Sequence, residues 1–172
     1  MDKDQSFFSV EHERESLRFL IAEAELLDDH LYSDWLEMIH PDITYKAPVR
    51  TVRENWDRTG VSDSAFYFEE TFGTLRTRVE KFKSRFAWSE NPSHITRRMV
   101  GNVRVKDVEG DDVSVRSNLV VFFHQKDKPN PFILTADRLD TIRFDKSAPQ
   151  LRSRNVILDK TVLDLGALSI FL

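Results

Sequence analysis

The side chains in this sequence that suit proton transfer lie far apart along the chain. Tyr45, His94 and Asp137 supply a phenol, an imidazole and a carboxylate, which act as acids and bases when a fold brings them into one pocket. Each of the three is also a common structural hydrogen-bonding residue. Their presence therefore leaves open an acid–base site and a purely structural role.

A second group, Asp28, Asp29 and His30, ends the first apolar-periodic segment. An acid–base cluster is one interpretation of these three residues. The other is a charged, solvated helix end, which is the commoner arrangement and the one that we favour.

Metal and cofactor sites have little support in this sequence. No two of the five histidines are three or four residues apart, the spacing that places two metal ligands on one face of a helix. The chain has no cysteine, which removes iron–sulfur and thiol chemistry from it. Its five glycines are too scattered for a phosphate-binding loop or a nucleophile elbow. A metal, nucleotide or nucleophile site in this chain therefore has no local support in the sequence.

Arginines and aspartates are concentrated in the second half of the chain. One interpretation is cross-strand ion pairs on a solvated face of a sheet, each worth little. The other is a polar subunit interface, because planar guanidinium groups pair with carboxylates through two hydrogen bonds. The residues concerned are Arg97, Arg98, Arg138, Arg143, Arg152, Arg154, Asp137, Asp140 and Asp159.

Composition indicates one domain over residues 1–172, because 172 residues that are 40% hydrophobic suffice for one sizeable core. A net charge of −4 and a pI near 5.8 argue against nucleic acid and anionic lipid as partners. The polar start of the chain is unlike a signal peptide, and no apolar run reaches the length of a membrane span. We expect a cytoplasmic protein.

Residues from about 10 to 90 are expected to be mainly helical. Apolar residues at helical spacing predict a long first helix over Val10–Leu31, with Leu17, Leu20, Ala24, Leu27 and Leu31 on its buried face. Ser33 is expected to cap a short helix from Asp34 to Ile39 that Pro41 ends. A short strand, Ile43–Lys46, and a polar stretch, 51–65, precede a third helix. Its apolar face comprises Phe72, Leu75, Val79, Phe82 and Phe86.

From about residue 95 to 165 the hydrophobic period changes to two, which predicts a sheet. Met99, Gly101, Val103 and Val105 are expected on one face of its first strand. A returning strand over 113–123 follows, and then two more strands over 132–144 and 151–163. Turn sequences at 109–112, 126–131 and 145–149 connect these four strands in order. Connections this short predict an antiparallel meander. An apolar tail, 167–172, follows.

The alternation weakens in the later strands, where Val120 and Phe122 lie opposite Leu119, Val121 and Phe123. An antiparallel sheet with one solvated face alternates cleanly, so both faces of this sheet are expected to be partly covered. A neighbouring subunit is the favoured cover. A curved sheet folded around its own pocket would give the same pattern.

Short pieces spread over nearly the whole chain form a recognisable pattern by their order and spacing, although no single piece is diagnostic. These pieces are Glu25–Asp28, Trp35-Leu36, Asp42–Tyr45, Pro48–Arg50, Leu75, Arg78-Val79, Asn91-Pro92, Arg97-Arg98, Asn102-Val103, Asp140, Arg143, Arg154, Leu158-Asp159 and Leu168–Leu172. Together they resemble the small, or beta, subunit of bacterial aromatic-ring-hydroxylating dioxygenases, the relatives of naphthalene and biphenyl dioxygenase. In place of the family's Pro-Ser-Arg-like run after Asn91-Pro92, this chain has Ser93-His94-Ile95.

The resemblance implies an α+β, cone-shaped fold in which a curved antiparallel sheet packs against three helices, as in ketosteroid isomerase and scytalone dehydratase. It implies a beta trimer beneath three large alpha subunits, an α3β3 complex. The alpha subunit would hold the Rieske 2Fe-2S cluster and the mononuclear iron, and the complex would receive electrons from NADH through a ferredoxin and a reductase to cis-dihydroxylate aromatic hydrocarbons.

Under this hypothesis the chain is a non-catalytic subunit that supports assembly of the alpha subunits, and it carries no catalytic, cofactor-binding or metal-binding residue. Its candidate interface residues are Arg97, Arg98, Asn102, Ile170, Phe171 and Leu172. Two alternatives remain: a stand-alone isomerase or dehydratase of the same fold that uses Tyr45 and Asp137, and a homo-oligomeric binding module without a catalytic partner.

Overall fold

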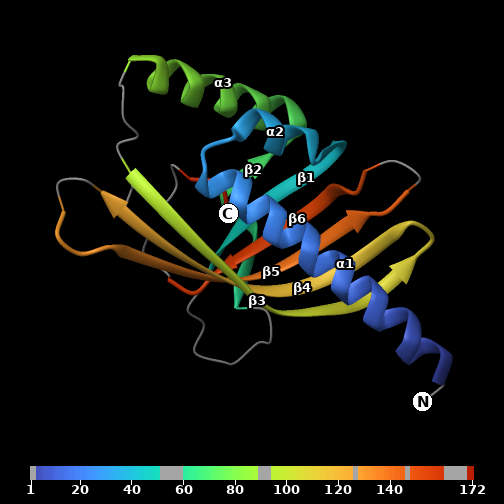
Figure 1. Ribbon diagram of the computed structural model, residues 1–172. Helices are drawn as coiled ribbons and strands as arrows, with labels where there is room; N and C mark the ends of the chain where they lie inside the picture. The colour runs from blue at the N-terminus through green and yellow to red at the C-terminus, as the bar shows by residue number, and fades with distance from the viewer. Residues whose placement is uncertain (1–2, 51–59, 89–93, 126–127, 146–147, 161–169) are drawn as a thin grey trace.

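The computed structural model describes residues 3–50, 60–88, 94–125, 128–145, 148–160 and 170–172, and within them three helices cover a six-stranded sheet (Figure 1). The α+β class predicted from the sequence is confirmed. The helices are α1 (Lys3–Asp28), α2 (Tyr32–Glu37) and α3 (Phe72–Trp88); the strands are β1 (Ile39–Arg50), β2 (Val61–Glu70), β3 (His94–Glu109), β4 (Asp112–Gln125), β5 (Phe132–Arg143) and β6 (Gln150–Leu158).

The sheet has the strand order β2-β1-β6-β5-β4-β3. Strands β3 to β6 form the predicted antiparallel meander, although β6 ends at Leu158 rather than at residue 163. Strand β1 runs antiparallel to β2 but parallel to β6, with Tyr45 opposite Arg154. The sheet is therefore mixed, and the expectation of a wholly antiparallel sheet was wrong for this one pair.

The segment between α1 and the sheet differs from the expectation. Helix α2 begins at Tyr32, its N-cap is Leu31, and no side chain caps it, so Ser33 is not the cap. The helix ends at Glu37, and Pro41 lies within β1 rather than at a helix end. The predicted strand Ile43–Lys46 is the centre of the longer β1. The pairing of β1 with β2 shifts register on both sides of Pro48, because proline has no amide hydrogen to donate to the neighbouring strand.

Strand β2 was not predicted. Its side chains are half-buried or exposed over most of its length, so no clean alternation marks it in the sequence. Part of the predicted polar stretch, 51–59, lies outside the described residues.

A bulge reverses the faces of β3 near its middle. Asn102 has a φ of 51°, and the pairing with β4 shifts register between Gly101 and Arg104. As a result Met99 points outward and is 62% exposed, whereas Val103 packs toward the core. The expectation that Met99 and Val103 share a face was wrong, because an inserted residue exchanges the two faces of a strand.

The helices bury their apolar faces against one side of the sheet. Helix α1 ends at Asp28 and not at Leu31 as expected, and its Leu20 and Leu27 are buried as predicted. Leu17 is 36% exposed, and Leu31, which lies beyond the helix, is 47% exposed, while Ser16 and Glu23 are buried instead. The predicted face of α3 is confirmed for its described side chains: Leu75 and Val79 are fully buried, and Phe72 and Phe82 pack against them. The side chain of Phe86 lies outside the described residues.

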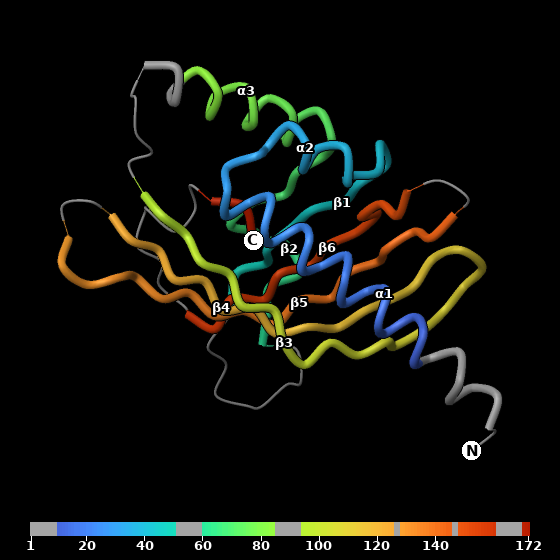
Figure 2. The backbone as a smooth tube through the Cα atoms, viewed as in Figure 1, coloured from blue at the N-terminus to red at the C-terminus, as the bar shows by residue number. Residues whose placement is uncertain are grey.

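The last described residues, 170–172, lie inside the fold. The backbone enters the space between α1, α2 and the sheet at this point (Figure 2). Ile170, Phe171 and Leu172 are 5%, 1% and 1% exposed. Residues 161–169 of the predicted strand end and tail lie outside the described residues.

Candidate functional site

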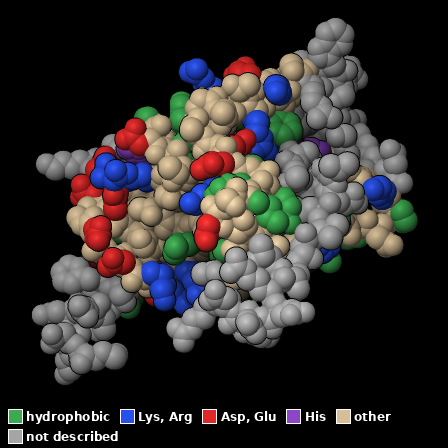
Figure 3. All heavy atoms as spheres, turned by 180° about the vertical axis from the view of Figure 1, so that it is seen from behind, with side chains coloured by type: hydrophobic (Ala, Val, Ile, Leu, Met, Phe, Trp, Pro, Cys, Tyr) green, Lys and Arg blue, Asp and Glu red, His purple; other side chains and the backbone are tan. Residues whose placement is uncertain are grey.

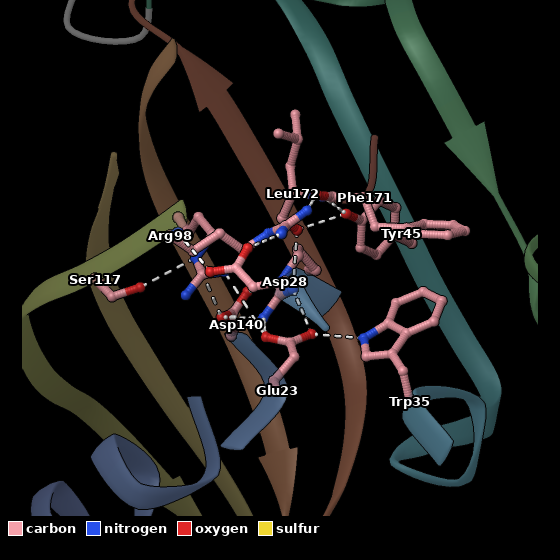
Figure 4. A network of polar contacts seen from close by, with 11 residues as sticks. Glu23, Asp28, Trp35, Tyr45, Arg98, Ser117, Asp140, Phe171 and Leu172 are labelled. Atoms are coloured by element: carbon pink, nitrogen blue, oxygen red, sulfur yellow. Dashed lines mark hydrogen bonds and ion pairs between the residues drawn. The ribbon is translucent and has the colours of Figure 1, made fainter. Parts of the chain in front are cut away.

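A network of charged side chains lies at the centre of the cone (Figure 4). Arg154 of β6 donates to Asp140 of β5 from Nε at 2.8 Å and from Nη2 at 2.9 Å. Its Nη1 and Nη2 each donate to Glu23 of α1 at 2.7 Å. One guanidinium group therefore connects the first helix to two neighbouring strands.

Three more side chains complete this network. The indole of Trp35 donates to Glu23 at 3.1 Å, and Arg138 Nη1 lies 3.8 Å from the same carboxylate. Arg138 Nε donates to Ser117 of β4 at 3.3 Å. Two buried guanidinium groups thus face two buried carboxylates, which satisfies the requirement that charges away from water be paired.

The electrostatics of the network follow from burial and pairing. Burial alone would raise the pKa of Glu23, but Arg154, the Trp35 hydrogen bond and Arg138 lower that pKa below its ordinary value of 4.5. Burial opposes the charge on Arg154, but Asp140 and Glu23 outweigh burial and hold its pKa above the ordinary value. Burial and the neighbouring Arg154 lower the pKa of Arg138. Pairing therefore favours the charged forms of Glu23 and Arg154.

Residues 170–172 occupy the space beside this network. The Tyr45 hydroxyl donates to the backbone oxygen of Leu172 at 2.5 Å and accepts from its amide at 2.7 Å. Arg154 Nη1 donates to the same oxygen at 2.9 Å. Burial raises the pKa of Tyr45, although Arg154 opposes that shift. The Tyr45 hydroxyl is therefore engaged within the chain.

The three residues considered for proton transfer do not share a pocket. Tyr45 contacts Leu172 in the interior. Asp137 lies on the opposite face of the sheet and pairs with Arg116 through hydrogen bonds of 2.7–3.1 Å. His94 is buried at the start of β3, where its ring stacks on Phe123 at 4.9 Å. The interpretation as a proton-transfer enzyme built on Tyr45 and Asp137 loses its geometric basis.

The Asp28 cluster is a structural ion pair. Asp28, at the end of α1, accepts from the Arg98 amide at 2.8 Å and the Thr96 hydroxyl at 2.9 Å, and it pairs with the Arg98 guanidinium. Its side chain is only 10% exposed, so the solvated helix end that we favoured was wrong for this residue. His30 has a φ of 61°, and burial together with Arg98 lowers its pKa.

Neither interpretation of the clustered arginines holds for all of them. Arg138 and Arg154 are 1% and 0% exposed, so they belong to the interior and not to a solvated face or an interface. Arg143 and Arg152 both pair with Asp112 across the sheet, as cross-strand ion pairs on a partly solvated face. The sequence signal missed here was the position of Arg154 on an inward-facing site of its strand.

The expected interface residues divide between the surface and the interior. Arg97 is exposed on β3, which lies at the edge of the sheet. Asn102 is exposed at the bulge of the same strand. Arg98 is bound to Asp28 and to the Phe171 oxygen at 2.7 Å, and Ile170, Phe171 and Leu172 are buried within this chain.

Two surface features adjoin Arg97. The first is a groove of about 380 Å³ between α1 and β3, lined by Ile21, Ala24, Glu25, Asp28, Asp29, Arg97, Arg98 and Val100. The second, the outer patch, consists of Ile95, Met99, Val120, Phe122 and Ile133 on the sheet face opposite to the helices.

Cross-strand pairing makes the outer patch continuous. Met99 lies opposite Val120, and Phe122 lies opposite Ile133. Met99 and Ile133 are 62% and 43% exposed. Viewed from behind, this side of the molecule shows hydrophobic side chains beside acidic and basic ones (Figure 3). Apolar side chains grouped on one exposed face are typical of an association surface.

A curved six-stranded sheet packs against three helices, and residues 170–172 are buried between them. This architecture is the cone-shaped α+β fold. A structure of naphthalene 1,2-dioxygenase superposes with a TM-score of 0.79 at 23% identity, covering 93% of this chain and 85% of that chain. A candidate scytalone dehydratase from Novosphingobium aromaticivorans gives a TM-score of 0.66 at 12% identity, covering 88% and 86%. The predicted likeness to scytalone dehydratase is confirmed at the level of fold.

The chain belongs to the ring hydroxylating beta subunit family, whose model matches residues 22–165. It is 30% identical to the chlorobenzene dioxygenase subunit beta of Cupriavidus sp. strain PS12, over 94% of this chain and 88% of that protein. It is 28% identical to the biphenyl 2,3-dioxygenase subunit beta of Rhodococcus jostii strain RHA1, over 95% and 89%. The family resemblance found in the sequence is confirmed, and it favours the subunit interpretation over the stand-alone enzyme and the binding module.

The described residues contain no group of three or more His, Cys, Asp or Glu side chains placed to hold a metal ion. No helix within them is long and apolar enough to cross a membrane.

Proposed function

We propose that this chain is a non-catalytic beta subunit of a Rieske non-haem iron dioxygenase that hydroxylates aromatic hydrocarbons in the cytoplasm. The family match over residues 22–165 is the observation that carries the proposal. A Rieske centre needs two cysteine and two histidine ligands, and this chain has no cysteine, so the cluster does not fit here. The Rieske cluster and the mononuclear iron would belong to a large alpha subunit that receives electrons through a ferredoxin and a reductase.

The interior of the cone supports a structural role for this chain. In a stand-alone enzyme of this fold, Tyr45 and an acid would face a cavity. Here the Tyr45 hydroxyl is bound to Leu172, and the buried acids Glu23 and Asp140 are both bound to Arg154. These groups stabilise the fold, so we expect the functional contacts of this chain to lie on its surface.

We assign subunit contacts to the edge and outer face of β3. The outer patch, with Arg97 and Asn102 beside it, would mediate association in an α3β3 complex that contains a trimer of this chain. The groove between α1 and β3 combines apolar Ile21 with charged Arg97 and Asp29, the mixture found at the rim of an interface. Ile170, Phe171 and Leu172 would support this surface from inside, through the Phe171 oxygen that binds Arg98.

The experiment is size-exclusion chromatography with light scattering on the chain alone and coexpressed with a dioxygenase alpha subunit, with iron analysis and visible spectra of each peak. We expect a colourless trimer alone and a brown, iron-containing hetero-oligomer with the partner. A colourless monomer or dimer that ignored the alpha subunit would contradict the proposal.

A further inference from the structure

The cone interior recognises residues 170–172 through their backbone. Three arginines from three different elements each donate to one of the three successive backbone oxygens, and a tyrosine from a fourth element donates to the last of them. Arg78 Nη2 of α3 donates to Ile170 at 3.2 Å, and Arg98 Nη2 of β3 donates to Phe171 at 2.7 Å. Arg154 of β6 donates to Leu172 at 2.9 Å, as does the Tyr45 hydroxyl of β1. Arrays of donors to consecutive backbone groups are typical of sites that bind extended peptides.

The side chain of Phe171 fills an aromatic pocket. Its ring centroid lies 4.4 Å from that of Trp35, 5.6 Å from that of Tyr32 and 5.5 Å from that of Phe82. The guanidinium carbon of Arg78 lies 4.3 Å from the centre of the Phe171 ring, a cation–π contact. Helices α2 and α3 supply all four of these side chains.

Each arginine of the site is held by a carboxylate that belongs to the rest of the fold. Arg78 pairs with Glu70 at 2.6 Å. Arg98 pairs with Asp28, and Arg154 pairs with Glu23 and Asp140. The donors are therefore positioned independently of residues 170–172, as in a preorganised binding site and unlike an ordinary apolar core, whose side chains position one another.

We propose that the interior of the cone is a peptide-binding site, and that residues 170–172 are its ligand within the same chain. The site takes a peptide with a central aromatic side chain between two aliphatic ones. Such a site binds the same residues when they are supplied as a separate peptide. This inference concerns the chain by itself and does not depend on the dioxygenase partner.

The first test uses the full chain and hydrogen exchange. The Leu172 amide donates to the Tyr45 hydroxyl, so it should exchange far more slowly than in an unstructured peptide. Tyr45→Phe removes the acceptor and should abolish this slow exchange. The control is Thr44→Val, which removes an exposed hydroxyl of the same strand that contacts Ser153. A Leu172 amide that exchanges at the unstructured rate in the unchanged chain would overturn the proposal.

The second test removes residues 170–172 and supplies an acetylated Leu-Ser-Ile-Phe-Leu peptide, corresponding to residues 168–172. We expect the deletion to lower the melting temperature and the peptide to restore it saturably, with a change in fluorescence from Trp35 beside the Phe171 ring. A peptide carrying Phe171→Ala should bind roughly 100-fold more weakly, because it leaves the aromatic pocket empty.

Two outcomes of the second test would overturn the proposal. One is a folded truncated chain that does not bind the peptide. The other is a truncated chain that stays unfolded even with excess peptide, because the site is inferred to be built without residues 170–172.

Discussion

Neutralising Glu23 should destabilise this protein far more than its position on an amphipathic helix indicates. Glu23→Gln keeps the shape of the side chain and removes the charge that faces Arg154 at 2.7 Å and Arg138 at 3.8 Å. Two buried guanidinium groups would then face Asp140 alone. Breaking a buried ion pair on one side costs about 3–5 kcal/mol, because the other charge is left without a partner.

The assay is urea unfolding at pH 7, followed by circular dichroism and tryptophan fluorescence. Glu25→Gln, two residues further along α1 and exposed, is the matched control and should change the free energy of unfolding by less than about 0.5 kcal/mol. A loss below about 1 kcal/mol for Glu23→Gln would refute the reasoning, because the interior would then accommodate an unpaired charge at little cost.

A second substitution tests the charge balance itself. Among the described residues, Arg138 Nη2 makes no hydrogen bond, so Arg138 is the less satisfied of the two guanidinium groups. Adding Arg138→Met to Glu23→Gln leaves one guanidinium facing one carboxylate. The double variant should recover part of the lost stability, and a strictly additive loss would show that charge balance is not the cause.

Four further predictions concern pH, packing, backbone and surface. Folding lowers the pKa of Glu23, so the stability that its charge provides is complete above the ordinary pKa of 4.5 and is lost as pH falls below that value. The urea midpoints of the original chain and of Glu23→Gln should therefore converge in acid. Phe171→Ala should lower the free energy of unfolding in urea by about 3–5 kcal/mol, since its ring is fully buried. Asn102→Val should cost about 1–2 kcal/mol in the same assay, because a φ of 51° is strained for a branched side chain, whereas Asn102→Gly should not. Met99→Asp should leave the melting temperature within a few degrees and should abolish assembly in light scattering, and unchanged assembly would remove the outer patch from the interface.

The parts of the fold that were predicted correctly have local signals in the sequence. Alternating residues and turn sequences are sufficient for strands β3 to β5, because each pairs with its neighbour along the chain. The pairing of Tyr45 with Arg154 joins segments more than 100 residues apart, and no local pattern records it. Strand β2 was missed because its partly exposed faces do not alternate cleanly.

The interior of the cone was predicted less well for a different reason. Hydrophobic periodicity treats charged residues as solvated, so it gives no indication that Glu23 and Arg154 are buried. Their burial depends on complementary charges that meet only after the sheet has formed. Phe171 and Leu172 were expected at a subunit interface, whereas they are buried within this chain. The sequence does not distinguish cover by another subunit from cover by the chain's own helices.

The parallel pairing of β1 with β6 has a consequence for folding during synthesis. Strands β1 and β2 leave the ribosome early, but β1 gains its second neighbour only when residues 150–158 follow. Until then the two strands form an isolated ribbon, which is marginally stable in water. The β3–β6 meander contains mainly local pairings, so we expect it to form first and to serve as the template onto which the N-terminal strands and helices close. On a ribosome stalled before β6, strands β1 and β2 should therefore remain sensitive to protease.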